Sequence, residues 1–185
     1  MKISEYTFMK MQKIDDYPPN CIRTNSGTFI NVFEPTPEMI VIEDIAHALS
    51  RLPRFGGHLN RPYSVAQHCV LATKRVKGLA NKKATLLHDA SEAYLLDMPS
   101  PIKARMHEYK EHEDKLMAAI FEKFDVEYPL NHAVKKVDRE MLDLEWENLV
   151  VNDNPDFKVW SANKAKKEFM KMYNKLFVER VVLFE

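Results

Sequence analysis

From Glu43 onward, the apolar residues of the chain recur three and four positions apart, which is the period of a helix with one buried face. Start and stop signals accompany this pattern. Pro53 follows the first segment, the sequence S-V-A-Q from residue 64 has the form of a capping box, and Asn131 can cap a later helix. The pattern predicts a mainly α fold, with helices over about 43–52, 64–76, 82–95, 106–124, 132–151 and 162–177.

The first 43 residues lack this period and hold four of the ten prolines. A turn signal at 25–27 (Asn-Ser-Gly) and the alternating residues after it favour a short N-terminal β-hairpin. The 185 residues contain no repeat, low-complexity segment or linker, which indicates one domain over 1–185. Its expected parts are a hairpin region (1–42), a core (about 43–150) and a C-terminal helix (about 162–177).

The composition excludes two common ways of binding phosphate. Lys+Arg and Asp+Glu both number 27, so the formal charge is zero, which argues against a nucleic-acid binder that works by bulk charge. The chain has only 4 glycines, where average usage would give about 13. Their positions allow neither of the standard glycine-rich phosphate loops. A phosphate would have to be held by side chains or by a metal ion.

The cysteines and the N-terminus suggest where the protein works. Cys21 and Cys69 form neither a C-x-x-C pair nor a disulfide framework, and free thiols suit a reducing compartment. The N-terminus has no apolar core of a signal peptide, and no stretch approaches 18 uncharged apolar residues. We therefore expect a cytoplasmic protein without membrane contacts.

His88, Asp89 and Glu92 lie three and four positions apart in the helix expected at 82–95, so they share one face of it. That face adjoins apolar residues, and burying an imidazole with two carboxylates costs free energy unless something compensates. A divalent cation would compensate, with His88 and Asp89 as ligands and Glu92 as a base or outer partner. A solvated polar face is the commoner explanation of such a pattern, so this helix alone does not decide.

Two further residues bear on this choice. His68 lies in the first turns of the helix expected at 64–76, among apolar neighbours. Asp138 lies in the apolar stripe of the helix expected at 132–151, where a carboxylate needs a partner. That partner is either a metal ion or a cationic side chain, for which the candidates are Arg51, Arg54 and Lys103.

In chain order these residues resemble the H…HD…D signature of the HD-domain phosphohydrolases. The segment HDASEAYLLDMPSPIK at 88–103 closely resembles the matching segment of the bacterial 5′-deoxynucleotidases, as do SRLPRF at 50–55 and SVAQH at 64–68. The small HD proteins of phages and bacteria, which include dATP triphosphohydrolases, are similar as well. The resemblance spans about 43–145 and implies a single HD-domain helical bundle.

The resemblance also implies a metal site. One divalent ion (Mn, Co, Zn, Fe, Ni or Mg) would be bound by two imidazoles and two carboxylates, which suit such metals. The implied ligands are His68, His88, Asp89 and Asp138.

Roles around the metal follow from the same resemblance. Glu92 matches the catalytic acid that positions or deprotonates the attacking water, Asp97 the acid near the deoxyribose 3′-hydroxyl, and Arg54 the arginine that holds the phosphate. Phe55 stands where the deoxynucleotidases have a tryptophan against the sugar. Further candidates for substrate contact are Lys103, which can offset phosphoryl charge, and His58, for which an ordinary loop histidine is the alternative.

Together these features predict a metal-dependent phosphohydrolase acting on deoxynucleotides. The favoured activity is removal of the 5′-phosphate from a deoxynucleoside monophosphate by a metal-activated water. The alternative is a dNTP (dATP-type) triphosphohydrolase that releases triphosphate, and a non-catalytic nucleotide-binding HD protein is less favoured because the signature is intact. The expected partners are a small-molecule nucleotide and, by resemblance, other copies of the chain in a homo-oligomer. Duplex nucleic acid is not expected as a partner.

Overall fold

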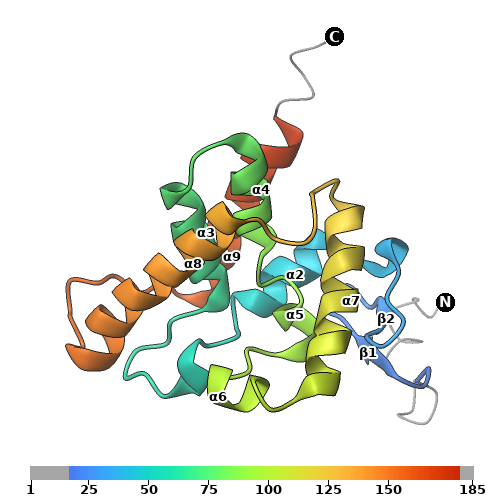
Figure 1. Ribbon diagram of the computed structural model, residues 1–185, viewed down its shortest axis with the longest axis horizontal. Helices are drawn as coiled ribbons and strands as arrows, with labels where there is room; N and C mark the ends of the chain where they lie inside the picture. Colours follow the sequence, from blue (N-terminus) through green and yellow to red (C-terminus); the bar gives the residue numbers. More distant parts are fainter. Residues whose placement is uncertain (1–16, 180–185) are drawn as a thin grey trace, which may run out of the picture.

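Helices dominate the computed structural model, which describes residues 17–179 (Figure 1). The first strands within the described residues form an antiparallel pair, which confirms the predicted hairpin, and the helices that follow confirm the mainly α fold class. The strands and α-helices are β1 (Cys21–Arg23), β2 (Phe29–Asn31), α2 (Ile42–Leu49), α3 (Val65–Arg75), α4 (Leu79–Leu87), α5 (Glu92–Leu95), α6 (Ser100–Lys103), α7 (His107–Lys123), α8 (His132–Glu145) and α9 (Ala162–Tyr173). Short 3₁₀ turns are η2 (Pro37–Met39) and η3 (Phe55–Gly57), and α8 and α9 continue as the π-helical segments η4 (Trp146–Val151) and η5 (Asn174–Val178).

The hairpin is tied to the helical part by a buried carboxylate. Gly27 takes a φ of 93° in the turn, a conformation that glycine adopts without steric cost. Asp44 of α2 accepts hydrogen bonds from the Ser26 amide at 2.7 Å and from its hydroxyl at 2.6 Å. Ile30 of β2 is fully buried in the same core as α2. The hairpin therefore covers one end of the helical core.

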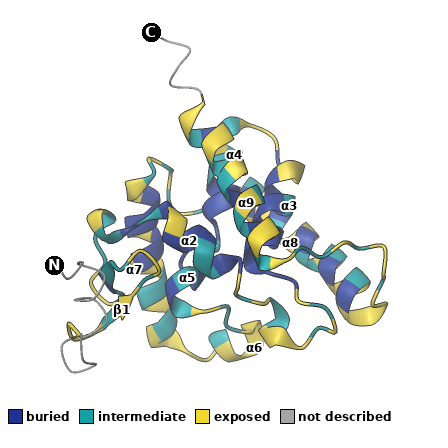
Figure 2. Ribbon diagram, turned by 180° about the vertical axis from the view of Figure 1, so that it is seen from behind, coloured by how far each residue is buried: buried dark blue, intermediate teal, exposed yellow. Residues whose placement is uncertain are grey.

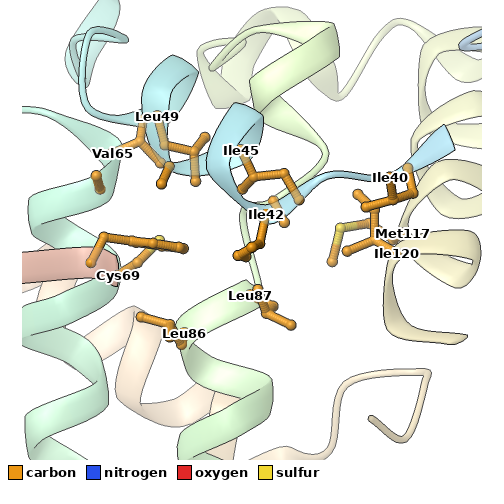
Figure 3. Packing of buried hydrophobic residues seen from close by; sticks show 14 of the residues in the cluster. Ile40, Ile42, Ile45, Leu49, Val65, Cys69, Leu86, Leu87, Met117 and Ile120 are labelled. Carbon is orange, nitrogen blue, oxygen red and sulfur yellow. The ribbon is translucent and has the colours of Figure 1, made fainter. Parts of the chain in front are cut away.

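α3 lies at the centre of the helical part, packed against α2, α4, α8 and α9. In Figure 3, Ile45 and Leu49 of α2 face Val65 and Cys69 of α3, while Leu86 of α4 closes the cluster from below. The buried residues run through the inner faces of these helices, whereas α6 is mostly exposed (Figure 2). Side chains on the inner face of α3 are thus withdrawn from water.

Ser64 caps α3 as predicted, because its hydroxyl accepts a hydrogen bond from the Gln67 amide at 3.3 Å. The Gln67 side chain does not complete the capping box. Its amide nitrogen donates to the Lys158 carbonyl at 2.8 Å, and its oxygen accepts from the Trp160 amide at 2.7 Å. Gln67 is fully buried where α3 meets the segment before α9. The two buried backbone groups need hydrogen-bond partners there, and the Gln67 side chain supplies them.

The prediction of a single helix over 82–95 was wrong. The α-helical hydrogen bonds end with α4, and the chain passes through a tight turn at 88–91 before α5. Inside the turn, Ala90 N–H donates to the Leu87 carbonyl at 2.9 Å and Glu92 N–H to the Asp89 carbonyl at 3.0 Å, three residues back in each case. His88 and Asp89 therefore lie in the turn, and Glu92 begins the next helix.

The other helices match their predictions closely: 132–151 is covered by α8 and η4 behind an Asn131 cap, and 162–177 by α9 and η5. No helix within 17–179 is long and apolar enough to cross a membrane. The N-terminal sequence examined for a targeting signal, and part of the region 1–42, lie outside the described residues. The domain boundaries, the cytoplasmic location and the homo-oligomer stay predictions.

Candidate metal centre

Four side chains from three parts of the chain meet beside α3. His68 comes from α3, His88 and Asp89 from the turn after α4, and Asp138 from α8. The Nε2 atom of His68 lies 3.1 Å from Nε2 of His88 and 3.1 Å from Oδ1 of Asp138. Asp89 Oδ2 lies 3.3 Å from His88 Nε2 and 3.6 Å from His68 Nε2. All four residues predicted as ligands are thus brought together.

The outer hydrogen bonds of the two imidazoles decide which nitrogen carries a proton. Nδ1 of His88 lies 2.7 Å from the Thr85 carbonyl, which can only accept, so this nitrogen donates. Nδ1 of His68 lies 2.6 Å from a carboxylate oxygen of Glu145 and donates in the same way. In the neutral rings, both Nε2 atoms then present lone pairs toward each other and toward the carboxylates of Asp89 and Asp138.

Such a convergence of acceptors fits a divalent cation. Two lone pairs and two anionic oxygens repel one another unless a positive charge lies between them. Asp89 Oδ2 is buried and has no hydrogen-bond partner among the described residues, as expected of an atom reserved for a cation. Two imidazoles with two carboxylates suit first-row divalent metals.

The pKa values of the ligands express the same demand for positive charge. Burial acts to lower the pKa of His88, but the charge of Asp89 and the hydrogen bond to Asp138 outweigh it and raise that pKa well above 6.5. Burial likewise acts to raise the pKa of Asp138, and its contacts with the two histidines lower it instead. The cluster therefore holds either protons or a metal ion, and the two compete.

Cys69 lies next to this cluster. Its sulfur and ligand atoms of His88 and Asp89 are all within 4.8 Å of one another. Burial raises the pKa of the Cys69 thiol to about 11, and a protonated thiol is a poor metal ligand. The set with His68 and Asp138 is therefore the better candidate.

Glu145 organises the centre from behind, and the sequence reasoning missed it. Its side chain is fully buried and accepts hydrogen bonds from His68 Nδ1 and from the Tyr63 hydroxyl, both at 2.6 Å. Its other oxygen lies 3.0 Å from Nε of Arg54. Burial acts to raise the pKa of Glu145, but the contacts with His68 and Arg54 lower it, so it stays a carboxylate. It orients His68 and holds Arg54 in place.

The spacing of Glu145 could have revealed it. Seven residues separate it from Asp138, which is two turns of α8, so both carboxylates lie on one face of that helix. Tyr63, its second donor, carries no comparable signal, because it precedes α3 in a loop.

Arg54 lies inside the site. Its guanidinium pairs with Glu145 and lies 3.6 Å from Asp89 Oδ2, with 11% of the side chain exposed. Burial acts to lower the pKa of Arg54, but the carboxylates of Glu145 and Asp89 outweigh it and raise that pKa. The guanidinium also lies over the Phe55 ring, 5.6 Å from its centroid. Arg54 thus has the charge and position to meet an anion that approaches Asp89.

Glu92 faces a cavity that adjoins the cluster. The cavity measures about 290 Å³ and is lined by His88, Asp89, Ser91, Glu92, Lys103, Glu113, Asp114, Met117, Tyr128, Pro129, Leu130 and Lys135. One oxygen of Glu92 is buried and has no hydrogen-bond partner within 17–179. Burial and the charge of Asp89 raise the pKa of Glu92 well above 4.5. Glu92 thus holds a proton more readily than an exposed glutamate, which is a property expected of a general acid or base.

Asp97, Lys103 and His58 are the remaining predicted site residues. Burial raises the pKa of Asp97 above its ordinary value, and the charge of Arg54 acts against this rise. The influence of Arg54 indicates that Asp97 lies close to the site. Lys103 lines the cavity but pairs with Glu113 at 2.5 Å, so its charge is already partly balanced. His58 is exposed on the loop after Phe55. Its ring is not among the groups that line the cavity, so a substrate contact stays a prediction.

The three cationic side chains predicted as alternative partners of Asp138 do not pair with it in the described part of the chain. Asp138 pairs with the two histidines, while Arg54 and Lys103 have other carboxylate partners and Arg51 donates to the His47 carbonyl. Its side chain is 43% exposed and so lies at the edge of the apolar stripe of α8. That position leaves the cluster open to solutes from one side.

Two proteins similar to this chain are named without an activity. The chain is 38% identical over 148 residues to the uncharacterized protein YfdR of Escherichia coli (strain K12), a match that covers 80% of the chain and 83% of YfdR. It is 36% identical over 140 residues to an uncharacterized protein of Rhodobacter capsulatus, covering 69% of the chain and 71% of that protein. No protein-family model matches the chain.

Proposed function

Since the chain belongs to the family of YfdR-like proteins, whose names state no activity, we propose a function from the site itself. The protein is a metal-dependent phosphohydrolase of the HD-domain type, and its substrate is a deoxynucleotide. One observation carries this proposal. The Nε2 atoms of His68 and His88 lie 3.1 Å apart, and each lies within 3.6 Å of a carboxylate oxygen of Asp89 and of Asp138. The buried carboxyl group of Glu92 belongs to the same region. The order of these residues in the chain is that of the HD signature.

The chemistry that a divalent cation supplies when bound by His68, His88, Asp89 and Asp138 is polarisation of a phosphate and a lowered pKa of water. Glu92 takes the proton of the attacking water and returns it to the leaving oxygen. Its raised pKa suits both halves of this transfer. The products of monophosphate hydrolysis are then inorganic phosphate and a deoxynucleoside.

Arg54 supplies the fixed positive charge for the phosphoryl oxygens. Because Glu145 and Asp89 hold its guanidinium, no reorganisation is needed when negative charge develops on the phosphate. This arrangement explains how a chain without a glycine-rich loop can bind phosphate. The positive charge is concentrated in one side chain and one metal ion.

The second candidate is the release of triphosphate from a dNTP, and the lysines that line the cavity support it. Lys103 and Lys135 both line the cavity that begins at His88 and Asp89. Two lysines beyond the site of cleavage suit the additional phosphates of a dNTP. Glu113 and Asp114 line the same cavity and act against them, so removal of phosphate from a monophosphate remains the first candidate.

One incubation series tests the proposal. Protein loaded with Mn²⁺, Co²⁺, Zn²⁺ or Mg²⁺ is mixed with each dNMP, dNTP and NTP, and the products are separated by chromatography. Inorganic phosphate from a dNMP supports the first candidate, and triphosphate with a deoxynucleoside from a dNTP supports the second. The Asp138→Ala variant is the control for a contaminating phosphatase. Absence of turnover with every metal and nucleotide would contradict the proposal, and nucleotide binding without turnover would favour a binding protein.

A further inference from the structure

Phe55 and Trp146 form an aromatic pair beside Arg54, and the proposed reaction gives no role to Trp146. Trp146, the first residue of η4, is 54% exposed, which is unusual for so large an apolar side chain. It is one of two tryptophans in the chain. Its ring lies 6.2 Å from the Phe55 ring, at an angle of 52° between the planes. Resting on the proposed function, we propose that Trp146, with Phe55 beside it, stacks the base of the nucleotide whose phosphate lies at the metal centre.

The position of Trp146 is fixed by the site itself. It directly follows Glu145, the buried carboxylate that binds His68 and Arg54. Arg54 in turn lies over the Phe55 ring and within 3.6 Å of Asp89. A short chain of contacts thus joins the exposed indole to a predicted metal ligand. A nucleotide has the same layout, with its base one sugar away from its phosphate.

The backbone of the neighbouring loop presents Phe55 in a costly conformation. Phe55 has a φ of 57°, and Gly56 and Gly57 follow with φ values of 60° and 77°. A bulky residue rarely adopts a positive φ, and such strain persists only where the surroundings enforce it. Two backbone hydrogen bonds do so, from the Arg54 amide to the Tyr63 carbonyl at 2.8 Å and from the Gly57 amide to the Arg54 carbonyl at 3.2 Å.

The ring chemistry of the pair suits a flat heterocycle. Every base has a π-face, and an exposed indole or phenyl ring binds it without reading its hydrogen-bonding edge. The two rings meet at a tilted angle and Trp146 is half-exposed, which leaves room for a third ring at the indole. Stacking of this kind selects nucleotides over small phosphates and discriminates weakly among the bases.

The other tryptophan provides a matched control. Trp160 is half-buried and flanked by Lys74 and Lys164, whose Nζ atoms lie 5.5 and 5.4 Å from its ring. It packs against the hydrophobic core, beside Lys74 in the last turn of α3. Trp160→Phe therefore leaves Trp146 as the single fluorescent tryptophan without altering the proposed base contact.

The test is a fluorescence titration of the double variant Glu92→Gln, Trp160→Phe, in which turnover is suppressed. Two probes are compared, dAMP and deoxyribose 5-phosphate, which lacks the base. We expect dAMP to quench Trp146 emission and the sugar phosphate to leave it almost unchanged. For binding measured by calorimetry, Trp146→Ala should reduce the preference for dAMP over deoxyribose 5-phosphate by about 10-fold, and Trp146→Phe should retain most of it.

Different failures have different meanings. Unchanged preference in Trp146→Ala, or equal loss for both probes, would overturn the base contact. Since Trp146 is exposed, the variant should unfold at the same temperature as the parent, and a lower midpoint together with equal loss would mark a structural role. If dAMP quenches Trp146 emission but the parent protein, with Glu92 intact, hydrolyses no nucleotide, the base contact is supported and the proposed function fails.

Discussion

Glu92→Gln is expected to lower kcat for the best nucleotide by about 100- to 10,000-fold, the range attributed to a positioned acid or base. The amide keeps the size of the side chain but cannot take a proton from water. Because Glu92 begins α5 and is not among the converging ligand atoms, metal content should stay at the parent value. Steady-state kinetics and elemental analysis of the same preparation measure the two quantities together.

A matched control is Glu111→Gln, which makes the same change at an exposed position of α7. It should leave both kcat and metal content unaltered. Loss of metal from Glu92→Gln would mean that Glu92 is a ligand. Turnover close to that of the parent would remove Glu92 from the reaction altogether.

Glu145→Ala is expected to have the largest effect on stability. The change leaves the Arg54 guanidinium without its main partner and His68 Nδ1 without its acceptor, in a region almost closed to water. Breaking one partner of a buried ion pair costs about 3–5 kcal/mol of unfolding free energy. Loss of the group that orients a ligating histidine should weaken metal binding by about 10- to 100-fold. Urea denaturation and metal titration measure these two effects.

Glu147→Ala serves as the comparison, since Glu147 lies two residues further along and its side chain is exposed. Its unfolding free energy should stay within about 0.5 kcal/mol of the parent. If Glu145→Ala has equal stability and equal metal affinity to this control, Glu145 neither supports Arg54 nor orients His68.

Residue types and spacing predicted that His88, Asp89 and Asp138 needed polar partners, and the resemblance to the HD-domain phosphohydrolases added His68 and grouped the four as ligands. The structure brings their side chains together. Asp138 in the apolar stripe of α8 and His68 in α3 both needed polar partners, and in the structure they pair with each other. Helical periodicity predicted most elements for a similar reason, because the amphipathic faces of α4, α8 and α9 are buried against α3, and that of α7 against η2. These features are local patterns that a sequence displays directly.

Other features depend on distant contacts and could not be predicted in this way. The periodicity of 82–95 is that of one helix, yet the chain tightens at 88–91. Gln67 had the capping-box position, but two backbone groups near α9 bind its side chain instead. Tyr63 contacts Glu145 and Trp146 contacts Phe55, and each pair is more than 80 residues apart in the chain, so no local pattern indicates either contact.

We propose that His68, His88, Asp89 and Asp138 together hold one divalent ion. The most direct measurement is an anomalous-difference map from crystals grown with Co²⁺, recorded at the cobalt edge. We predict a single strong peak within bonding distance of both Nε2 atoms and both carboxylates, and its loss in crystals of Asp138→Ala. Absence of that peak in the parent protein, or a peak of equal height in the variant, would contradict the account.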